Sequence, residues 1–255
     1  MVKMSDNLTG QKKTAVITGG SSGIGFAVAS RLAADGLTCI LIGRNRQKLE
    51  EACRKTGNSS YGFPADLTDL SSLPALVREI VSKFGRIDVL VNNAGIHLKK
   101  PALEVTDEEY QRVILTNQTS VFVLTRETAK IMAAAGGGSV INISSMASHY
   151  GLPGVIAYAA SKSAVEGMTR SLAVELAPYN IRVNCIAPGF IKTDMSSSAL
   201  DSDPSRKERV LARTPMARLG KPSEVADAVS FLVSEAASFI TGIVMPVDGG
   251  NSIGF

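Results

Sequence analysis

The stretch TAVITGGSSGIG (Thr14–Gly25) passes from a short apolar run directly into a glycine-rich turn. The run Thr14–Thr18 predicts a strand that is covered on both faces, because it is almost continuously apolar. Behind the turn, Phe26–Ala34 has the spacing of an amphipathic helix. A strand, a glycine-rich turn and a helix in this order predict the first unit of an α/β fold.

The same alternation of apolar runs and helical segments continues along the whole chain. The expected strands are Thr14–Thr18, Thr38–Ile42, Tyr61–Ala65, Val89–Asn92, Ser139–Ile143, Arg182–Ile186 and Ile243–Pro246. The expected helices are Phe26–Ala34, Gln47–Lys55, Leu73–Phe84, Glu108–Ala134, Ala157–Leu176 and Ser223–Val233. This pattern predicts a doubly wound, parallel, seven-stranded sheet with helices on both faces, a Rossmann fold. Ligands of such sheets bind at the carboxyl ends of the strands.

The glycine-rich turn has the composition of an anion site. Glycines let the backbone turn tightly and approach an anion closely, and the free N–H groups at a helix start favour a pyrophosphate. The spacing Gly19-x-x-x-Gly23-x-Gly25 differs from the common dinucleotide fingerprint, and a purely structural turn is the alternative. Its place between the first strand and the first helix favours the cofactor. The candidate contacts are Gly19, Ser21, Ser22, Gly23, Ile24 and Gly25.

The residues after the second strand indicate which dinucleotide binds. A site for NAD places a carboxylate here to accept from the ribose 2′-hydroxyl. This chain has Arg44 and Asn45 instead. A guanidinium suits a 2′-phosphate, so the sequence predicts NADP(H); the alternative is that Arg44 is an ordinary surface residue before the next helix.

Two more strand ends carry polar or small residues. Asp66, with Leu67 beside it, follows the third strand and is placed to accept from an adenine amino group. Asn93, Ala94 and Gly95 follow the fourth strand, where a cofactor would pass close to the backbone. Ordinary turns or helix caps explain both equally well in isolation, and Asp66 belongs to a cluster that resembles an N-cap.

The candidate catalytic residues are Ser145, Tyr158, Lys162 and Asn117. Tyr158 and Lys162 are four residues apart in an expected helix and therefore share a face. A nearby ammonium would lower the pKa of the phenol and make it a useful acid or base at neutral pH. Ser145, at the end of the fifth strand, would donate to the same substrate oxygen. Asn117 is a polar residue in an apolar helix, either a satisfied core residue or the holder of a relay water.

Taken together, TGGSSGIG, NNAG, Asn117, Ser145, Tyr158-x-x-x-Lys162 and Pro188-Gly189-x-x-x-Thr193 resemble the short-chain dehydrogenase/reductase superfamily. The resemblance runs from about Lys12 to Gly250. It implies Tyr158 as acid/base, Ser145 as the group that polarises the carbonyl, and Asn117 as the anchor of a proton relay. It implies that Lys162 binds the nicotinamide ribose and lowers the Tyr158 pKa. By the same resemblance Ile191 and Thr193 hold the nicotinamide carboxamide, and Asn93 lies on the adenosine side.

Composition narrows the class of protein. The 255 residues are 45% hydrophobic and 5% aromatic, and the net charge of +4 is dispersed. These values predict a folded chain and disfavour binding to nucleic acid. The three cysteines lack metal-ligand spacing, and no apolar run approaches the roughly 18 residues of a membrane span. We therefore expect a single domain over residues 1–255, in the cytoplasm, without a metal ion or a membrane partner.

The substrate is less well defined. The polar segment of about residues 193–215 suits a lid, and His97 and His149 follow strands that border the cleft. The carboxyl-terminal FITGIVMPVDGG resembles 3-oxoacyl-carrier-protein reductases, whereas IHLKKPALEVTDEEY and Arg213-Thr214-Pro215 resemble gluconate 5-dehydrogenase. The chain departs from the carrier-protein reductases it resembles, which have basic docking residues where this chain has Ala133–Gly138 and Val174. A ketone, a 3-oxoacyl-type compound and a keto sugar acid all remain open as substrates.

Two further expectations concern the kind of protein and its assembly. A non-catalytic NADP(H) sensor is the alternative from another class, although such a protein would usually lack part of the catalytic set. The family resemblance implies a homotetramer. The helices Glu108–Ala134 and Ala157–Leu176 would form its interface, and the apolar tail Ser252–Phe255 would dock onto a neighbouring subunit.

Overall fold

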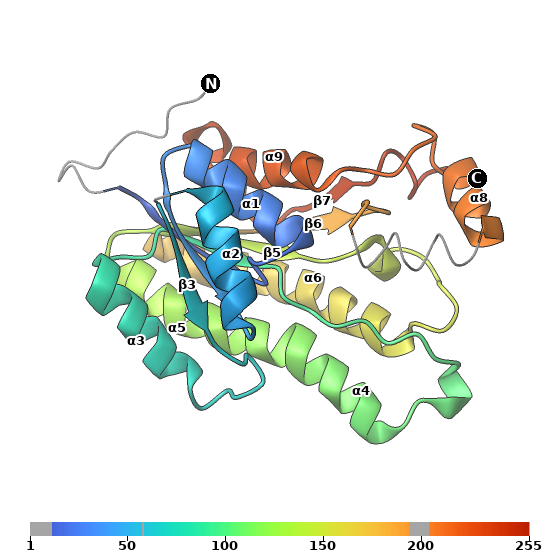
Figure 1. The fold of residues 1–255 in the computed structure, drawn as a ribbon, viewed down its shortest axis with the longest axis horizontal. Helices are drawn as coiled ribbons and strands as arrows, with labels where there is room; N and C mark the ends of the chain where they lie inside the picture. Colours follow the sequence, from blue (N-terminus) through green and yellow to red (C-terminus); the bar gives the residue numbers. More distant parts are fainter. Residues whose placement is uncertain (1–11, 58, 194–203, 255) are drawn as a thin grey trace.

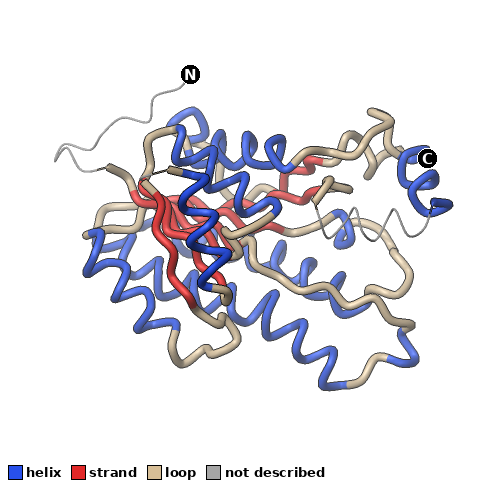
Figure 2. The backbone as a smooth tube through the Cα atoms, viewed as in Figure 1, coloured by secondary structure: helices blue, strands red, loops and turns tan. Residues whose placement is uncertain are grey.

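The structure, a computed structural model, describes residues 12–57, 59–193 and 204–254. A seven-stranded parallel sheet with the order β3-β2-β1-β4-β5-β6-β7 runs through it (Figures 1 and 2). The strands are β1 Thr14–Thr18, β2 Thr38–Gly43, β3 Ser60–Pro64, β4 Val89–Asn92, β5 Gly138–Ile143, β6 Ile181–Pro188 and β7 Val244–Val247. The expected doubly wound Rossmann fold is confirmed.

The order of the strands reverses next to β1. The chain winds outward in one direction from β1 to β2 and β3, then returns to add β4 on the other side of β1 and continues to β7. Val16 of β1 pairs with Ile40 of β2 on one side and with Leu90 of β4 on the other. The crevice between the carboxyl ends of β1 and β4 is therefore the topological switch point, where ligands of this fold bind.

Helices cover both faces of the sheet (Figure 1). The α-helices are α1 Gly23–Ala34, α2 Arg46–Thr56, α3 Leu73–Phe84, α4 Asp107–Ile114, α5 Ser120–Ala134, α6 Ile156–Leu176, α8 Pro204–Arg213 and α9 Pro222–Val233. Leu32 of α1 and Leu232 of α9 belong to the core on one face, whereas Ile80 of α3 and Leu124 of α5 belong to the core on the other. The near-continuous apolar strands between these two layers are buried on both sides.

One expected helix is interrupted. The segment predicted as a single helix over Glu108–Ala134 forms α4, a π-helical turn over Leu115–Thr119, and α5. Asn117 lies in the π turn and is fully buried. A π turn inserts one residue into a helix and is frequent at functional sites, and here it turns the Asn117 carboxamide toward the segment that follows β4.

The predicted lid of about residues 193–215 is described only in part, because residues 194–203 lie outside the described ranges. Its second half forms α8. Within the described ranges, no helix is long and apolar enough to span a membrane, and no group of three or more potential metal-ligating His, Cys, Asp or Glu residues gathers.

Candidate active site

The glycine-rich turn between β1 and α1 leaves no room for side chains at two of its positions. Gly19 has a φ of +64°, in the left-handed region that favours glycine. A Cβ at Gly25 would lie 2.3 Å from the Gly19 carbonyl oxygen and 2.5 Å from Nδ2 of Asn93. The close packing that requires these glycines also brings the turn against the end of β4. The turn therefore fits the pyrophosphate of a dinucleotide, as the sequence predicts.

The start of α1 keeps hydrogen-bond donors available beside this turn. Ser22 is its N-cap residue, is exposed, and makes no side-chain bond to the first N–H groups of the helix. Uncapped N–H groups and the positive end of the helix dipole attract an anion. Ser21 packs against Gly43, the last residue of β2, because a Cβ at Gly43 would lie 3.6 Å from the Ser21 Oγ.

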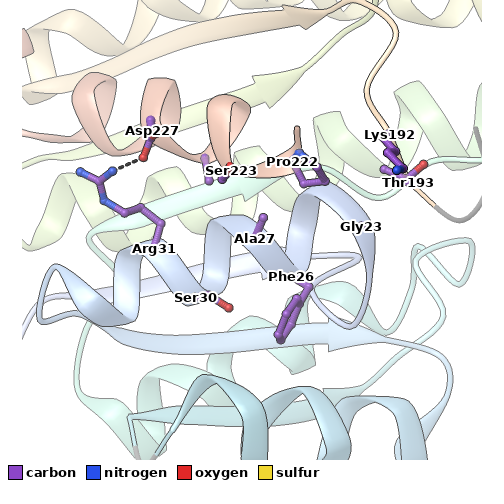
Figure 3. Close-up of a pocket in the computed structure, with 11 residues that line it drawn as sticks. Gly23, Phe26, Ala27, Ser30, Arg31, Lys192, Thr193, Pro222, Ser223 and Asp227 are labelled. Carbon is purple, nitrogen blue, oxygen red and sulfur yellow. Dashed lines mark hydrogen bonds and ion pairs between the residues drawn. The ribbon is translucent and has the colours of Figure 1, made fainter. Parts of the chain in front are cut away.

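The loop after β6 reaches the same place. Cγ2 of Thr193 would lie 3.5 Å from a Cβ at Gly23, and Ile191 is buried, forming an isolated bridge with Gly220. Thr193 and Gly23 both line a cavity of about 560 Å³ between α1 and α9, which Figure 3 shows with the Arg31–Asp227 ion pair beside it. Pro188 is the last residue of β6, and the N–H of Gly189, which follows it, donates to the Val247 carbonyl oxygen at 3.0 Å. The structure thus brings the predicted cofactor residues of the glycine-rich turn, the start of α1 and the loop after β6 close together.

The ends of β2 and β3 approach each other on the adenosine side. Arg44 is exposed and makes no ion pair with the described residues, and its charge helps to lower the pKa of Asp66. The largest cause of that lowered pKa is the hydrogen bond from the Thr68 N–H, followed by the Thr68 hydroxyl. One Asp66 oxygen therefore closes a local turn, as the alternative interpretation allowed, and the predicted adenine contacts of Asp66 and Leu67 stay a prediction.

Asn45 and Asn93 have structural roles that their cofactor assignments did not include. Oδ1 of Asn45 accepts from the Lys48 N–H and caps α2. Nδ2 of Asn93 donates to the carbonyl oxygens of Thr18 and Gly19 at 3.0 and 3.4 Å. Asn93 thereby ties the start of the glycine-rich turn to the segment that follows β4. Contact of either residue with the cofactor stays a prediction.

The turn after β4 packs against two candidate catalytic residues. A Cβ at Gly95 would lie 3.2 Å from Oδ1 of Asn117 and 3.6 Å from Nζ of Lys162. Asn117 is held on both sides of its amide: Oδ1 accepts from Ile96 N at 2.8 Å, and Nδ2 donates to Ile96 O at 2.9 Å and to Ser161 Oγ at 3.1 Å. Ala94 and Gly95 thus lie next to the catalytic residues, and Asn117 fixes this backbone to α6.

Tyr158 and Ser145 form a hydrogen-bonded pair. Ser145 follows β5, and its Oγ also accepts from the Ala147 N–H at 3.2 Å. Burial raises the pKa of the Tyr158 phenol, and the hydrogen bond with the Ser145 side chain opposes this effect. The ring of His97 also lies next to Tyr158, with the two ring centroids 4.8 Å apart. Tyr158 is therefore in contact with a second hydroxyl group and with an imidazole ring.

Lys162 is buried on α6, one turn after Tyr158. Its Nζ donates to the Ile143 carbonyl at 2.7 Å and lies 5.7 Å from the centroid of the Tyr158 ring. Burial lowers the pKa of Lys162 from 10.5 to about 8. In this structure the ammonium is not among the causes that set the Tyr158 pKa, and the expectation that it lowers this pKa stays a prediction. Desolvation of the phenol is the largest influence on that pKa, and the ammonium faces the ring and a carbonyl.

A buried carboxylate next to Ser145, the candidate catalytic serine, was missed by sequence reasoning. Glu166 accepts hydrogen bonds from Ser144, Ser148 and His149, which lie in the segment of residues 144–149, here called the serine turn. The signal was present in the spacing: residues 158, 162 and 166 are each four apart and share one face of α6. His149 thus contacts Glu166, and a role in substrate binding stays a prediction.

The arrangement can protonate and polarise a single oxygen atom. With a raised pKa, Tyr158 is a neutral phenol at neutral pH and can donate its proton, while Ser145 supplies a second hydroxyl at the same oxygen. Donors placed where negative charge develops stabilise a transition state. The glycine-rich turn and the catalytic residues lie along the same edge of the sheet, so a dinucleotide held by the turn would reach them.

Comparison with known proteins supports this description. Residues 19–252 match the family model described as enoyl-(acyl carrier protein) reductase. The 3α-hydroxysteroid dehydrogenase of Mediterraneibacter gnavus is 38% identical over 94% of this chain and 96% of its own. The 3-oxoacyl-(acyl-carrier-protein) reductase FabG of Thermotoga maritima is 39% identical over 93% and 97%. Among solved structures, an actinorhodin polyketide ketoreductase variant with NADPH superimposes with a TM-score of 0.90, at 34% identity over 95% and 98% of the two chains.

These matches extend over nearly the whole chain, from the glycine-rich turn through the carboxyl-terminal strand. They agree with the resemblance drawn from TGGSSGIG, Ser145 and Tyr158-x-x-x-Lys162. The chain belongs to the short-chain dehydrogenase/reductase superfamily of oxidoreductases.

Proposed function

We propose that the protein is an NADP(H)-dependent oxidoreductase that interconverts a carbonyl compound and a secondary alcohol. The observation that carries this proposal is the hydrogen-bonded pair of Tyr158 and Ser145, with Lys162 buried one helical turn away. A protonated phenol beside a second hydroxyl can donate to a carbonyl oxygen, and the Ser145 hydrogen bond opposes the rise in the Tyr158 pKa that burial causes. In the opposite direction the phenolate form of Tyr158 would receive the proton of the alcohol.

The residues present fit a nicotinamide dinucleotide. The turn from Gly19 to Gly25 would hold the pyrophosphate, because it presents backbone N–H groups and tolerates no Cβ at Gly25. Ile191, Thr193 and the Pro188–Gly189 turn would border the nicotinamide. When bound, the nicotinamide supplies or accepts the hydride. Lys162 would bind the adjoining ribose, and Asn117 would keep the start of the proton path in place.

The preference for the phosphorylated cofactor rests on Arg44. Its side chain is exposed at the end of β2, next to Asp66 and without an ion-pair partner among the described residues. A free guanidinium matches the geometry and charge of a 2′-phosphate. The polyketide ketoreductase that this chain resembles was solved with NADPH, which supports the same preference.

The substrate we propose is a ketone or 3-oxoacyl-type compound that is not delivered by a carrier protein. Val174 lies on α6 and is 77% exposed. The carrier-protein reductases that this chain resembles typically have a basic residue at this position. The segment Ala133–Gly138, which leads into β5, has no basic residue where the carrier-protein reductases have them by resemblance. An acidic carrier would lack basic partners at these two places.

A second candidate is a sugar-acid dehydrogenase of the gluconate 5-dehydrogenase type. His97 favours it, because this imidazole lies beside the Tyr158 ring and can exchange hydrogen bonds with a polyhydroxylated substrate. The sensor alternative is disfavoured because Asn117, Ser145, Tyr158 and Lys162 are all present and gathered at one edge of the sheet.

The proposal is tested by following NADPH consumption with keto sugar acids, acetoacetyl thioesters and aryl ketones, and by repeating each assay with NADH. We expect turnover of at least one class, faster with NADPH. The gluconate candidate is checked in the reverse direction with gluconate and NADP⁺. Binding of NADPH without turnover of any carbonyl, while the Tyr158→Phe variant binds equally well, would favour the sensor instead.

We also propose a homotetramer in which α4, α5 and α6 form a helical interface. Phe122 on α5 and Val174 on α6 are 40% and 77% exposed apolar residues on these helices. The structure describes the predicted docking tail Ser252–Phe255 only as far as Gly254. Its docking onto a neighbouring subunit stays a prediction. Sedimentation equilibrium measures the mass directly, and a monomer would contradict the proposal.

The remaining proposals concern organisation and compartment. We propose that residues 1–255 form one domain, with about residues 193–215 closing over the substrate, and that the enzyme works in the cytoplasm. All three cysteines are free thiols, and burial raises the pKa of Cys39 and Cys185 to about 12. Unreactive, unpaired thiols suit a reducing compartment. Cell fractionation tests the location.

A further inference from the structure

Glu166 is a carboxylate inside the catalytic layer that the proposed reaction does not use. Its side chain is 11% exposed, and it lies on α6 one turn beyond Lys162. Lys162 does not pair with it, since Nζ of Lys162 donates to Ile143. Burying a carboxylate is costly unless several donors satisfy it. Its partners therefore indicate what it does.

Three donors converge on a single oxygen of Glu166. Oε1 accepts from Ser144 Oγ at 2.7 Å, from Ser148 Oγ, and lies 3.0 Å from His149 Nε2. All three come from the serine turn, so the carboxylate binds this turn from both sides of Ser145. Hydrogen bonds to a charged acceptor are roughly twice as strong as those between neutral groups.

The same network continues directly to Ser145. The Ser148 hydroxyl also contacts the Ser145 carbonyl oxygen, which accepts from the Ser148 N–H at 3.0 Å as well. The Ser144 hydroxyl contacts the Lys162 carbonyl oxygen at 3.3 Å. Glu166 thus fixes the backbone on either side of the residue whose hydroxyl meets Tyr158, and it ties that backbone to the helix that carries Tyr158.

We infer that Glu166 is a positioning residue for the catalytic serine: its carboxylate clamps the serine turn to α6 and so holds the Ser145 hydroxyl at the Tyr158 hydroxyl. This inference rests on the proposed function for its catalytic readout. Glu166 touches neither substrate nor cofactor in this role. A displacement of about 1 Å in a catalytic group can cost about 10²-fold in rate, so loss of the clamp affects turnover without removing a reacting group.

The test compares Glu166→Leu, which removes the acceptor, with Glu166→Gln, which keeps Oε1 as an acceptor. Glu175→Gln on the exposed side of the same helix is the matched control. We expect kcat to fall about 10- to 100-fold in Glu166→Leu and by less than about threefold in Glu166→Gln. The NADPH dissociation constant should stay within about twofold in every variant, because the cofactor turn is untouched. Wild-type kcat in Glu166→Leu, or equal losses in the Leu and Gln variants, would overturn the inference.

A second variant separates positioning from general loss of structure. Ser148→Ala removes one link between Glu166 and Ser145 and leaves two donors on the carboxylate. We expect a kcat loss of about 3- to 10-fold, and no further loss when Ser148→Ala is added to Glu166→Leu, because both act through one network. If Glu166→Leu does not fold, Ser148→Ala carries the test, and an unchanged kcat in this variant would contradict the clamp.

Hydrogen exchange gives a readout that does not depend on turnover. Amide exchange in the serine turn should accelerate in Glu166→Leu and Ser148→Ala, while exchange in α1 and α9 stays as in the wild type. Unchanged exchange in the serine turn would overturn the inference even if kcat fell. Should the wild type turn over no carbonyl compound, the proposed function fails, and the exchange experiment still decides whether the clamp exists.

Discussion

Nζ of Lys162 donates a 2.7 Å hydrogen bond to the carbonyl oxygen of Ile143, the last residue of β5. The bond joins the helix that carries Tyr158 to the strand that leads into Ser145. A buried ammonium therefore has a structural partner before any cofactor contact is considered. Its charge also remains costly, since burial lowers its pKa to about 8.

The lowered pKa of Lys162 predicts how the enzyme responds to pH. Below pH of about 8 the side chain is charged, and above it the ammonium is lost while the Tyr158 phenol, with a raised pKa, stays protonated. We expect kcat/KM for carbonyl reduction to fall above pH 8, because the charge that we propose binds the nicotinamide ribose disappears. A profile of kcat/KM from about pH 6 to 10 measures this, and a flat profile would contradict it.

Lys162 affects stability in the opposite direction: activity should fall as the pH rises, whereas the contribution of Lys162 to the free energy of unfolding should increase. The unfolded chain keeps the Lys162 proton up to about pH 10.5, whereas the folded chain releases it near pH 8. Between these values the unfolded state binds more protons, so the contribution of Lys162 to the free energy of unfolding rises with pH. Urea titrations of the wild type and of Lys162→Met at several pH values isolate this difference.

Substitution at Gly25 tests the cofactor turn. In Gly25→Ala the new Cβ would meet the Gly19 carbonyl oxygen at 2.3 Å, so the turn must move. We expect NADPH affinity to fall at least about tenfold and stability to fall by about 1–3 kcal/mol. Gly167→Ala on α6 is the control, because no atom lies within 4 Å of the added Cβ. Equal NADPH affinity in both variants would exclude the turn as the pyrophosphate site.

Arg44→Ala tests the choice of cofactor. Loss of a charge-assisted bond to the 2′-phosphate should weaken NADPH binding by about 1.5–3 kcal/mol and leave NADH binding nearly unchanged. Fluorescence titration with both cofactors measures the two affinities. Arg46→Ala, two residues further on in α2, serves as a control for a general change in charge. A similar loss for both cofactors in Arg44→Ala would refute the assignment.

Asn117→Ala should lower stability as well as activity. Truncation leaves the N–H and carbonyl groups of Ile96 without the amide that now satisfies both. We expect a loss of about 1–3 kcal/mol in the free energy of unfolding, the cost of unsatisfied buried polar groups. Urea unfolding measures it, and Gln118→Ala in the same π turn is the comparison. If Asn117→Ala were as stable as the wild type, a purely catalytic role would be indicated.

Most of the fold could be predicted because periodicity reports burial directly. The expected strands Thr14–Thr18 and Val89–Asn92 and the helix Leu73–Phe84 have the observed bounds. The π turn around Asn117 could not be predicted, because an apolar period continues through it. It is accompanied by a pair of tertiary hydrogen bonds from Asn117 to Ile96, which no local pattern contains.

The site was predictable where chemistry follows from spacing and less so where it follows from packing. The four-residue interval placed Tyr158 and Lys162 on one face, and the position of Ser145 after a strand brought it to them. The direction of the Tyr158 pKa depends on burial and on where the ammonium points, and sequence gives neither. Glu166 was overlooked because its partners come from a turn about 20 residues earlier in the chain.

The central claim, that Tyr158 delivers the proton, is tested most directly by Tyr158→Phe. Single-turnover NADPH oxidation with whichever carbonyl the wild type reduces gives the rate of the chemical step, and NADPH titration gives the affinity. The rate should fall about 10²–10⁴-fold, the usual contribution of a positioned acid, while the NADPH dissociation constant stays within about twofold. A variant that still reduces the carbonyl at a near-normal rate would contradict the account.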